Sequence, residues 1–195
     1  MKKYVLAVFV LCSLSFPFAV QAAEWQYDTT HTRFYFEIDH TFAKVRGYFE
    51  DFSGTFRFDP KNPKDGKIDV EIKVKSINTG VPKRDNHLRS GDFFDVAKYP
   101  LITFKSKKIT HKEGGVYLVE GDFTMKDVTK TLVLPLIYLG TKDNPLQEGE
   151  LVAGFETKLT IDRFDYHVGT GKFYEIGVVG KDVDITAVIE VVRKK

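Results

Sequence analysis

Apolar and polar residues alternate through most of the chain after its first 22 residues. In the clearest case, Ile68, Val70 and Ile72 alternate with lysine, aspartate and glutamate, and Phe34 and Phe36 begin a second such run. Because successive side chains of a strand point to opposite faces, this pattern predicts half-buried strands with one apolar face each. About eight strands are predicted in this way, near residues 34–40, 52–58, 67–75, 101–109, 116–125, 131–139, 150–161 and 181–192.

The segments between these strands indicate how the strands connect. Residues 59–66, 113–115 and 143–145 are rich in glycine, proline, asparagine and aspartate, so short turns should join antiparallel neighbours. Residues 84–95 do not alternate and predict a short helical crossing segment. Such strands can form a sandwich or a barrel, and their length favours an all-β, eight-stranded antiparallel barrel, which can enclose a ligand.

The first 22 residues have the layout of a secretory signal peptide. Lys2 and Lys3 precede an apolar run, and Val20 and Ala22 place small residues at the −3 and −1 positions of a cleavage site. We expect cleavage after Ala22, export, and a single domain over residues 23–195. The apolar run is too short and interrupted to predict stable membrane insertion.

Charge and cysteine content narrow the classes of partner. The chain carries 29 basic and 27 acidic residues, a formal charge of +2, which gives no basic patch for nucleic acid. The single cysteine, Cys12, lies in the leader, so the mature chain is expected to contain no disulfide. Oligomeric state, including a homodimer, is left open by the sequence.

A run of ordered positions resembles a known family. Residues 84–95 read RDNHLRSGDFFD and are followed by Tyr99 and Pro100, and further matches include Asp28 with His31 and Arg163 with Asp165. Together they resemble the YceI-like proteins over nearly the whole mature chain. The resemblance implies an extended lipocalin-like barrel that holds a polyisoprenoid or another long-chain amphiphile in the periplasm.

The apolar positions of the predicted strands supply candidates for the cavity lining. An aromatic and aliphatic interior suits a long alkyl or prenyl chain, because burial of each CH₂ contributes about 0.8 kcal/mol. The alternative is that the same side chains simply fill a core. The candidates are Phe34, Phe36, Ile38, Val70, Ile72, Ile102, Phe104, Val119, Phe123 and Phe155.

Polar residues near the ends of strands are candidates for contacting a ligand head group. Arg84, His87 and Arg89 lie close together in the one segment without strand character, and His40 follows the apolar positions of 34–38. Arginine can hold a phosphate or carboxyl group through charge-assisted hydrogen bonds. The alternative is structural, with Asp85 capping a short helix and an arginine fastening it to the barrel.

Two further polar groups carry weaker signals. The spacing of His31, His40 and His87 matches no metal-binding motif, so no metal or cofactor is expected. Arg163 and Asp165 are expected to form a salt bridge at a strand end, before a glycine-rich mobile loop.

The chain shows no nucleophile elbow or phosphate-binding loop. The leading interpretation is therefore a non-enzymatic binding or carrier protein. An enzyme acting on an isoprenoid lipid and a ligand-free structural or interaction protein are the alternatives.

Overall fold

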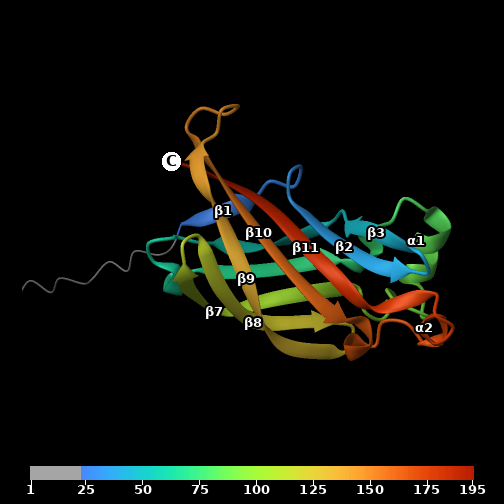
Figure 1. Ribbon diagram of the computed structural model, residues 1–195. Helices are drawn as coiled ribbons and strands as arrows, with labels where there is room; N and C mark the ends of the chain where they lie inside the picture. The colour runs from blue at the N-terminus through green and yellow to red at the C-terminus, as the bar shows by residue number, and fades with distance from the viewer. Residues whose placement is uncertain (1–22) are drawn as a thin grey trace, which may run out of the picture.

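The computed structural model describes residues 23–195, which form one antiparallel sheet closed into a barrel (Figure 1). The expected signal peptide lies outside the described residues. The strands are β1 (Glu24–Tyr27), β2 (Arg33–His40), β3 (Ala43–Phe49), β4 (Phe52–Arg57), β5 (Lys67–Lys73), β6 (Ile77–Asn78), β7 (Leu101–Glu113), β8 (Val116–Met125), β9 (Val128–Asp143), β10 (Glu150–Asp162) and β11 (Val179–Lys194).

Short strands combine to give an eight-stranded barrel. The strands β1, β4, β5, β7, β8, β9, β10 and β11 pair in a closed ring, and the pairing of β1 with β11 completes it. The remaining strands β2, β3 and β6 extend the same sheet from β11. Both β1 and β2 pair with β11, so they act as two halves of one longer strand. In the same way β4, which pairs with β1, and β3, which pairs with β2, act as two halves of the next one. The predicted eight-stranded antiparallel barrel is confirmed.

The strand boundaries differ from the prediction where alternation fails. The sequence did not predict β3, because Gly47 replaces an apolar side chain and Ala43 and Lys44 give no contrast between faces. Gly47 sits directly beneath the Phe36 ring, where a Cβ would lie 2.4 Å from Phe36 Cζ. The missing side chain therefore makes room for a neighbouring aromatic one.

Short helices occupy one end of the barrel. The predicted crossing segment contains α1 (Pro82–Arg89), which begins at Pro82 because proline suits the first helical turn. The polar cluster after β10 forms the 3₁₀ turn η3 (Arg163–Tyr166), and the glycine-rich loop that follows it contains the single-turn helix α2 (Lys172–Glu175). The other 3₁₀ turns are η1 (Pro63–Asp65) and η2 (Val74–Ser76).

Figure 1 shows α1 and α2 at one end of an elongated barrel, and the β9–β10 hairpin and the C-terminus at the other. Three rings connect the two helical segments: His87 packs edge-on against Phe93 at 5.1 Å and Phe173 at 5.9 Å between ring centroids. No helix within residues 23–195 is long and apolar enough to cross a membrane.

An aromatic cluster fills part of the interior away from the helices. The Phe58 ring lies 4.9 Å from Tyr117 and 5.1 Å from Phe155, and the Phe56 ring lies 4.8 Å from Phe155. Edge-to-face arrangements of this kind add to the stabilisation that comes from burial alone. This part of the barrel is therefore a packed core.

Candidate functional site

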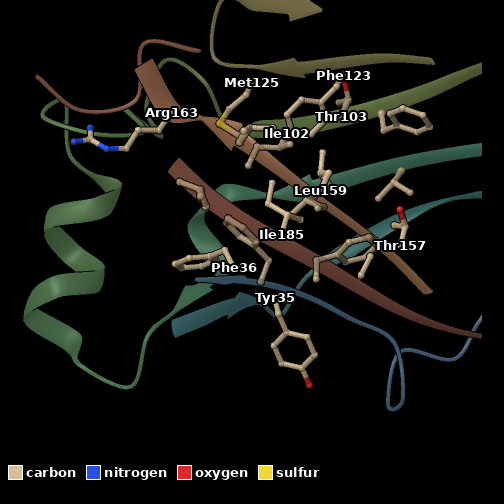
Figure 2. A pocket seen from close by; sticks show the side chains of 18 of the residues that line it. Tyr35, Phe36, Ile102, Thr103, Phe123, Met125, Thr157, Leu159, Arg163 and Ile185 are labelled. Carbon is tan, nitrogen blue, oxygen red and sulfur yellow. The ribbon is translucent and has the colours of Figure 1, made fainter. Parts of the chain in front are cut away.

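An apolar cavity of about 190 Å³ occupies the barrel interior between this aromatic cluster and the helical end (Figure 2). Inward-facing side chains of strands on all sides of the barrel line it, together with residues of the α1 segment. The lining residues that were not among the candidates named from the sequence include Phe49, Ile68, Ile77, Leu88, Phe93, Phe94, Met125, Leu134, Leu136, Leu159, Ile161, Val168, Val183, Ile185, Ala187 and Ile189.

Nine of the ten predicted lining candidates face this cavity. They are Phe34, Phe36, Ile38, Val70, Ile72, Ile102, Phe104, Val119 and Phe123. Phe155, the tenth candidate, does not line the cavity. It is fully buried within the aromatic cluster, against Phe56, Phe58 and Tyr138. Its inward orientation follows from alternation, but neighbouring rings fill the barrel at its level.

The lining differs between the two ends of the cavity. Ile38, Leu88 and Phe94, near the helices, are partly exposed, whereas Leu136 and Ile189 are buried. The lining is therefore less deeply buried near α1 than toward the aromatic cluster.

Arg84 and Arg89 fasten α1 to the barrel and do not line the cavity, contrary to the head-group prediction. The guanidinium of Arg84 donates to the Thr79 hydroxyl at 2.7 Å and the Thr79 carbonyl at 2.9 Å. That of Arg89 donates to the carbonyls of Lys75 at 2.7 Å and Ile77 at 2.8 Å. These bonds go to carbonyls in and beside β6. Both arginines therefore have the structural role considered above, in which an arginine fastens the helix to the barrel.

Asp85 also has the structural role. Its Oδ1 accepts hydrogen bonds from the backbone N–H of Thr79 at 2.9 Å and from the Thr79 hydroxyl at 2.6 Å. The contact ties the buried carboxylate to the turn before α1 and does not cap the helix N-terminus, whose N-cap residue Val81 has no side-chain hydrogen bond.

The two candidate histidines are also outside the lining. His40 is exposed at the last position of β2, although it has the same alternation parity as Phe34, Phe36 and Ile38. His87 donates from Nε2 to the Asp92 carboxylate at 2.9 Å while its ring packs between the helical segments. Its place is thus in the end wall of the barrel.

Four lining residues carry polar atoms: Tyr35, Thr103, Thr157 and Arg163. In Figure 2 the Tyr35 ring projects away from the other labelled side chains, and Arg163 and Thr157 lie on opposite sides of the group. Thr157 is 7% exposed, and its buried hydroxyl has no hydrogen-bond partner within residues 23–195. Hence one buried hydroxyl of a cavity-lining residue is unsatisfied within the described part of the chain.

The predicted salt bridge between Arg163 and Asp165 is not formed. Asp165 pairs with Lys130 at 2.6 Å, and the adjacent Asp162 pairs with Lys181 at 2.8 Å. Arg163 lies in η3 and donates to the carbonyls of Val168 at 2.7 Å and Gly180 at 2.9 Å, and in Figure 2 its guanidinium points away from the other labelled side chains. Sequence alternation could not predict these partners because Arg163 lies in a 3₁₀ turn.

One surface cluster has the composition of a metal site. The ligand atoms of Asp28, His31 and Glu190 lie within 4.8 Å of one another. His31 donates from Nδ1 to the Asp28 carboxylate at 2.8 Å, and this bond, with the Asp28 charge, raises the pKa of His31. A hydrogen-bonded ion pair explains the cluster without a metal ion.

Comparison with known proteins places this cavity in a family. The YceI-like domain model matches residues 25–191. Protein YceI of Salmonella newport is 37% identical over 199 residues, and a UPF0312 protein of Pectobacterium atrosepticum is 35% identical over 198 residues, each covering all of both chains.

Solved structures agree with this result. BcnA of Burkholderia cenocepacia superposes with a TM-score of 0.75 at 25% identity, covering 84% of this chain and 98% of BcnA. A Campylobacter jejuni YceI protein gives 0.69 at 25% identity, covering 97% and 100%. A polyisoprenoid binding domain from Saccharophagus degradans shares the fold, with a TM-score of 0.65 at 18% identity over 86% of this chain and 97% of that domain. The chain belongs to the YceI-like domain family.

Proposed function

We propose that the protein is a periplasmic carrier that holds a polyisoprenoid or another long-chain amphiphile inside the barrel. The observation that carries the proposal is the cavity itself. Apart from Tyr35, Thr103, Thr157 and Arg163, its lining consists of aliphatic and aromatic side chains.

Apolar burial alone can supply useful affinity. Ten methylene groups moved from water into such a lining contribute roughly 8 kcal/mol before the cost of ordering the chain. This gross value corresponds to about micromolar dissociation, to which a head-group contact would add. The shape also suits a chain, because the cavity lies inside an elongated barrel.

The similarity to relatives supports the class of ligand. The Saccharophagus domain with this fold is described as polyisoprenoid binding. We extend that class of ligand to this chain because nine aromatic and aliphatic positions predicted for a lipid-binding barrel face its cavity.

The lining favours binding over catalysis. Serine, cysteine, histidine, aspartate and glutamate do not occur among the cavity-lining residues of the described chain. Ser76 and Ser90 lie elsewhere, and their hydroxyls donate to the carbonyls of Lys73 and His87 at 2.7 Å each. We therefore propose that no bond is made or broken in the cavity and that the ligand leaves unchanged.

Export is part of the proposal. Expression of the full chain in a bacterial host should yield periplasmic protein whose intact mass begins at Ala23, as cleavage after Ala22 requires. Recovery of uncleaved protein in the cytoplasm would contradict the periplasmic assignment.

The direct experiment is native mass spectrometry of protein from the periplasm, followed by denaturation and lipid identification. We expect an adduct that is released on denaturation and contains a prenyl or long alkyl chain. A consistently ligand-free protein that also fails to take up farnesol would contradict the function.

A further inference from the structure

One seam of the barrel wall lacks strand pairing along part of its length. Strands β9 and β10 pair from their hairpin as far as Thr157 with Leu136, and within the described residues they do not pair beyond that point. Residues 128–135 of β9 pair with β8 alone, and residues 158–162 of β10 pair with β11 alone. We call these two unpaired edges the β9–β10 split. Figure 1 shows the two strands together at their hairpin and separating toward the helical end.

Pro135 marks the point at which the pairing of β9 with β10 ends. It directly precedes Leu136 and pairs with Leu118 on β8, so it lies within the strand. Proline has no backbone N–H, and within sheets it is confined to edges that face no partner strand. The sequence itself therefore carries the signal for a free edge at this position.

The β9–β10 split borders the cavity. Leu134 of β9 and both Leu159 and Ile161 of β10 belong to the cavity lining. On the outer face of β9, Val133 is 56% exposed. An apolar chain that crosses the wall here meets apolar side chains on both faces. Its passage breaks no ladder hydrogen bond between β9 and β10, whereas paired strands would lose theirs.

Side chains obstruct both ends of the barrel. At the helical end the centroid of the His87 ring lies 5.1 Å from that of Phe93 and 5.9 Å from that of Phe173, and the two phenylalanine rings stack at 6.3 Å. At the other end the Phe58 ring packs against Tyr117 and Phe155. The side wall is therefore the less obstructed route for a long chain.

A second unpaired edge of the barrel is covered. Residues 43–47 of β3 pair with β2 alone, but the segment that contains α1 packs beside this part of the sheet. The Phe94 ring lies 6.3 Å from the Phe49 ring, and Arg89 donates to the Ile77 carbonyl at 2.8 Å. These contacts fix the covering segment in place.

Side-chain contacts close the helical end of the β9–β10 split. Lys130 Nζ of β9 lies 2.6 Å from Asp165 Oδ2 of η3 and 5.4 Å from the centroid of the Tyr166 ring. His167 donates from Nδ1 to the Asp127 carboxylate at 3.0 Å. In the described chain no backbone–backbone hydrogen bond joins η3 to β9. Because the ion pair of Lys130 with Asp165 is partly exposed, breaking it costs little.

We propose that the β9–β10 split is the portal through which the ligand enters and leaves the barrel, and that the ion pair of Lys130 with Asp165 is its latch. The strands move apart at the split, the chain passes between Leu134 and Leu159, and the side-chain contacts form again behind it. The inference rests on the proposed function and assigns the route by which its ligand exchanges.

A cross-link across the split tests the portal directly. Residues 23–195 contain no cysteine, and Val133 and Thr160 would face each other if the register of Thr157 with Leu136 continued. Delipidated Val133→Cys/Thr160→Cys protein is joined by a short cleavable bismaleimide. Radiolabelled farnesol should then associate and dissociate at least about tenfold more slowly, because binding that needs an opening step is slowed when the opening is blocked. Cleavage of the linker should restore both rates.

The same cysteine at position 133 supplies the matched control. Glu120 on β8 is the paired neighbour of Val133, so a linker in Glu120→Cys/Val133→Cys joins two strands that are already hydrogen-bonded. This linker should leave both rates for farnesol unchanged.

The latch gives a second test that needs no linker. Asp165→Asn removes the ion pair and should speed association and dissociation together by about two- to fivefold, as loss of an exposed ion pair predicts, with Kd unchanged. Asp143→Asn is the control, because it removes the exposed pair with Lys195, 2.9 Å long, at the other end of β9. It should change neither rate.

Unchanged rates after cross-linking across the split, or equal slowing by the Glu120 linker, would overturn the portal. If the two split cysteines cannot be joined, unchanged rates in Asp165→Asn overturn it instead. Slowing by the cross-link without acceleration in Asp165→Asn, or a weaker Kd in that variant, would overturn the latch alone. Failure of wild type to bind farnesol at all would contradict the proposed function rather than the route.

Discussion

Two buried threonines have opposite hydrogen-bonding environments. The Thr157 hydroxyl in the cavity wall has no partner, whereas the fully buried Thr32 hydroxyl donates to the Glu190 carbonyl at 2.8 Å and accepts from the Glu190 N–H at 3.0 Å. An unsatisfied buried polar group costs about 1–3 kcal/mol, and a satisfied one loses a similar amount when its partner is removed.

Valine at these two positions should therefore have opposite effects. Thr157→Val should stabilise ligand-free protein by about 1 kcal/mol, and Thr32→Val should destabilise it by about 1–3 kcal/mol. Urea unfolding of delipidated protein measures both. Destabilisation by Thr157→Val would show that its hydroxyl has a partner after all.

The pair of Asp28 and His31 predicts a pH-dependent contribution to stability. The hydrogen bond and the charge of Asp28 raise the pKa of His31. Burial tends to raise the pKa of Asp28, but the hydrogen bonds from His31 and Thr30 outweigh it, so the pKa of Asp28 is lowered. The contribution of His31 to the free energy of unfolding is thus fully present below the pKa of unfolded histidine, about 6.5. It is lost as the pH rises through the raised pKa of the folded state. The aspartate contribution is lost as pH falls through the lowered value.

Accordingly, His31→Gln should lower the free energy of unfolding more at about pH 5.5 than at about pH 8.5. Urea unfolding at the two pH values measures the difference, and an Asp28→Asn background should abolish it. An equal effect of His31→Gln at both pH values would contradict the ion pair.

For single residues, sequence alternation predicts which face of the sheet a side chain points to, but not which residues surround it. It correctly orients Phe34 and Val119 inward, because strand geometry alone fixes the face. It could not predict that rings occupy the space around Phe155, nor that Arg84, Arg89 and Arg163 all donate to backbone carbonyls. Those outcomes depend on residues that are distant in sequence.

Among the elements, the β4–β5 pair contains a backbone contact that tolerates no side chain. A Cβ at Gly54 would lie 2.0 Å from the Asp69 carbonyl oxygen, and its φ is +155°. Gly54→Ala should destabilise the protein by on the order of 1–3 kcal/mol through strain or displaced strands. Thermal unfolding measures this, with Gly91→Ala as control because nothing lies within 4 Å of a Cβ there. Equal melting temperatures of the two variants would refute the close approach.

The helical segment shows what local sequence can and cannot predict. The absence of alternation explains why 84–95 was expected to contain a helix, and α1 is present. The local sequence pattern could not predict that Arg84 and Arg89 of this helix bond to residues 75–79, because those contacts depend on where β6 ends. The single-turn helix α2 was missed for a similar reason, since its flanking glycines read as a loop.

For the molecule as a whole, an eight-stranded antiparallel barrel could be predicted from strand number and length, whereas the contacts that close it and the extent of the cavity could not. Closure depends on two short contacts, Gln26 with Val192 and Tyr27 with Val191, which join the first and last strands. The cavity depends on how far side chains from opposite walls reach across the barrel. Both are properties of three-dimensional packing that periodicity does not contain.

The central claim is that a lipid chain occupies the barrel interior, and Ala187 offers the sharpest test. Ala187 lies in the cavity wall, paired with Phe34 on β2 and with Thr157 on β10. The next residue, Val188, is exposed on the outer face. Ala187→Phe places a ring in the cavity without crowding a filled core, and Val188→Phe adds the same ring outside.

Titration of delipidated wild type, Ala187→Phe and Val188→Phe with farnesol measures the claim most directly. We predict that Ala187→Phe loses at least about tenfold in affinity, because the ring displaces several buried CH₂ groups at about 0.8 kcal/mol each. Val188→Phe should bind as wild type does. Unchanged affinity in a folded Ala187→Phe variant would contradict the proposal that the ligand lies inside the barrel.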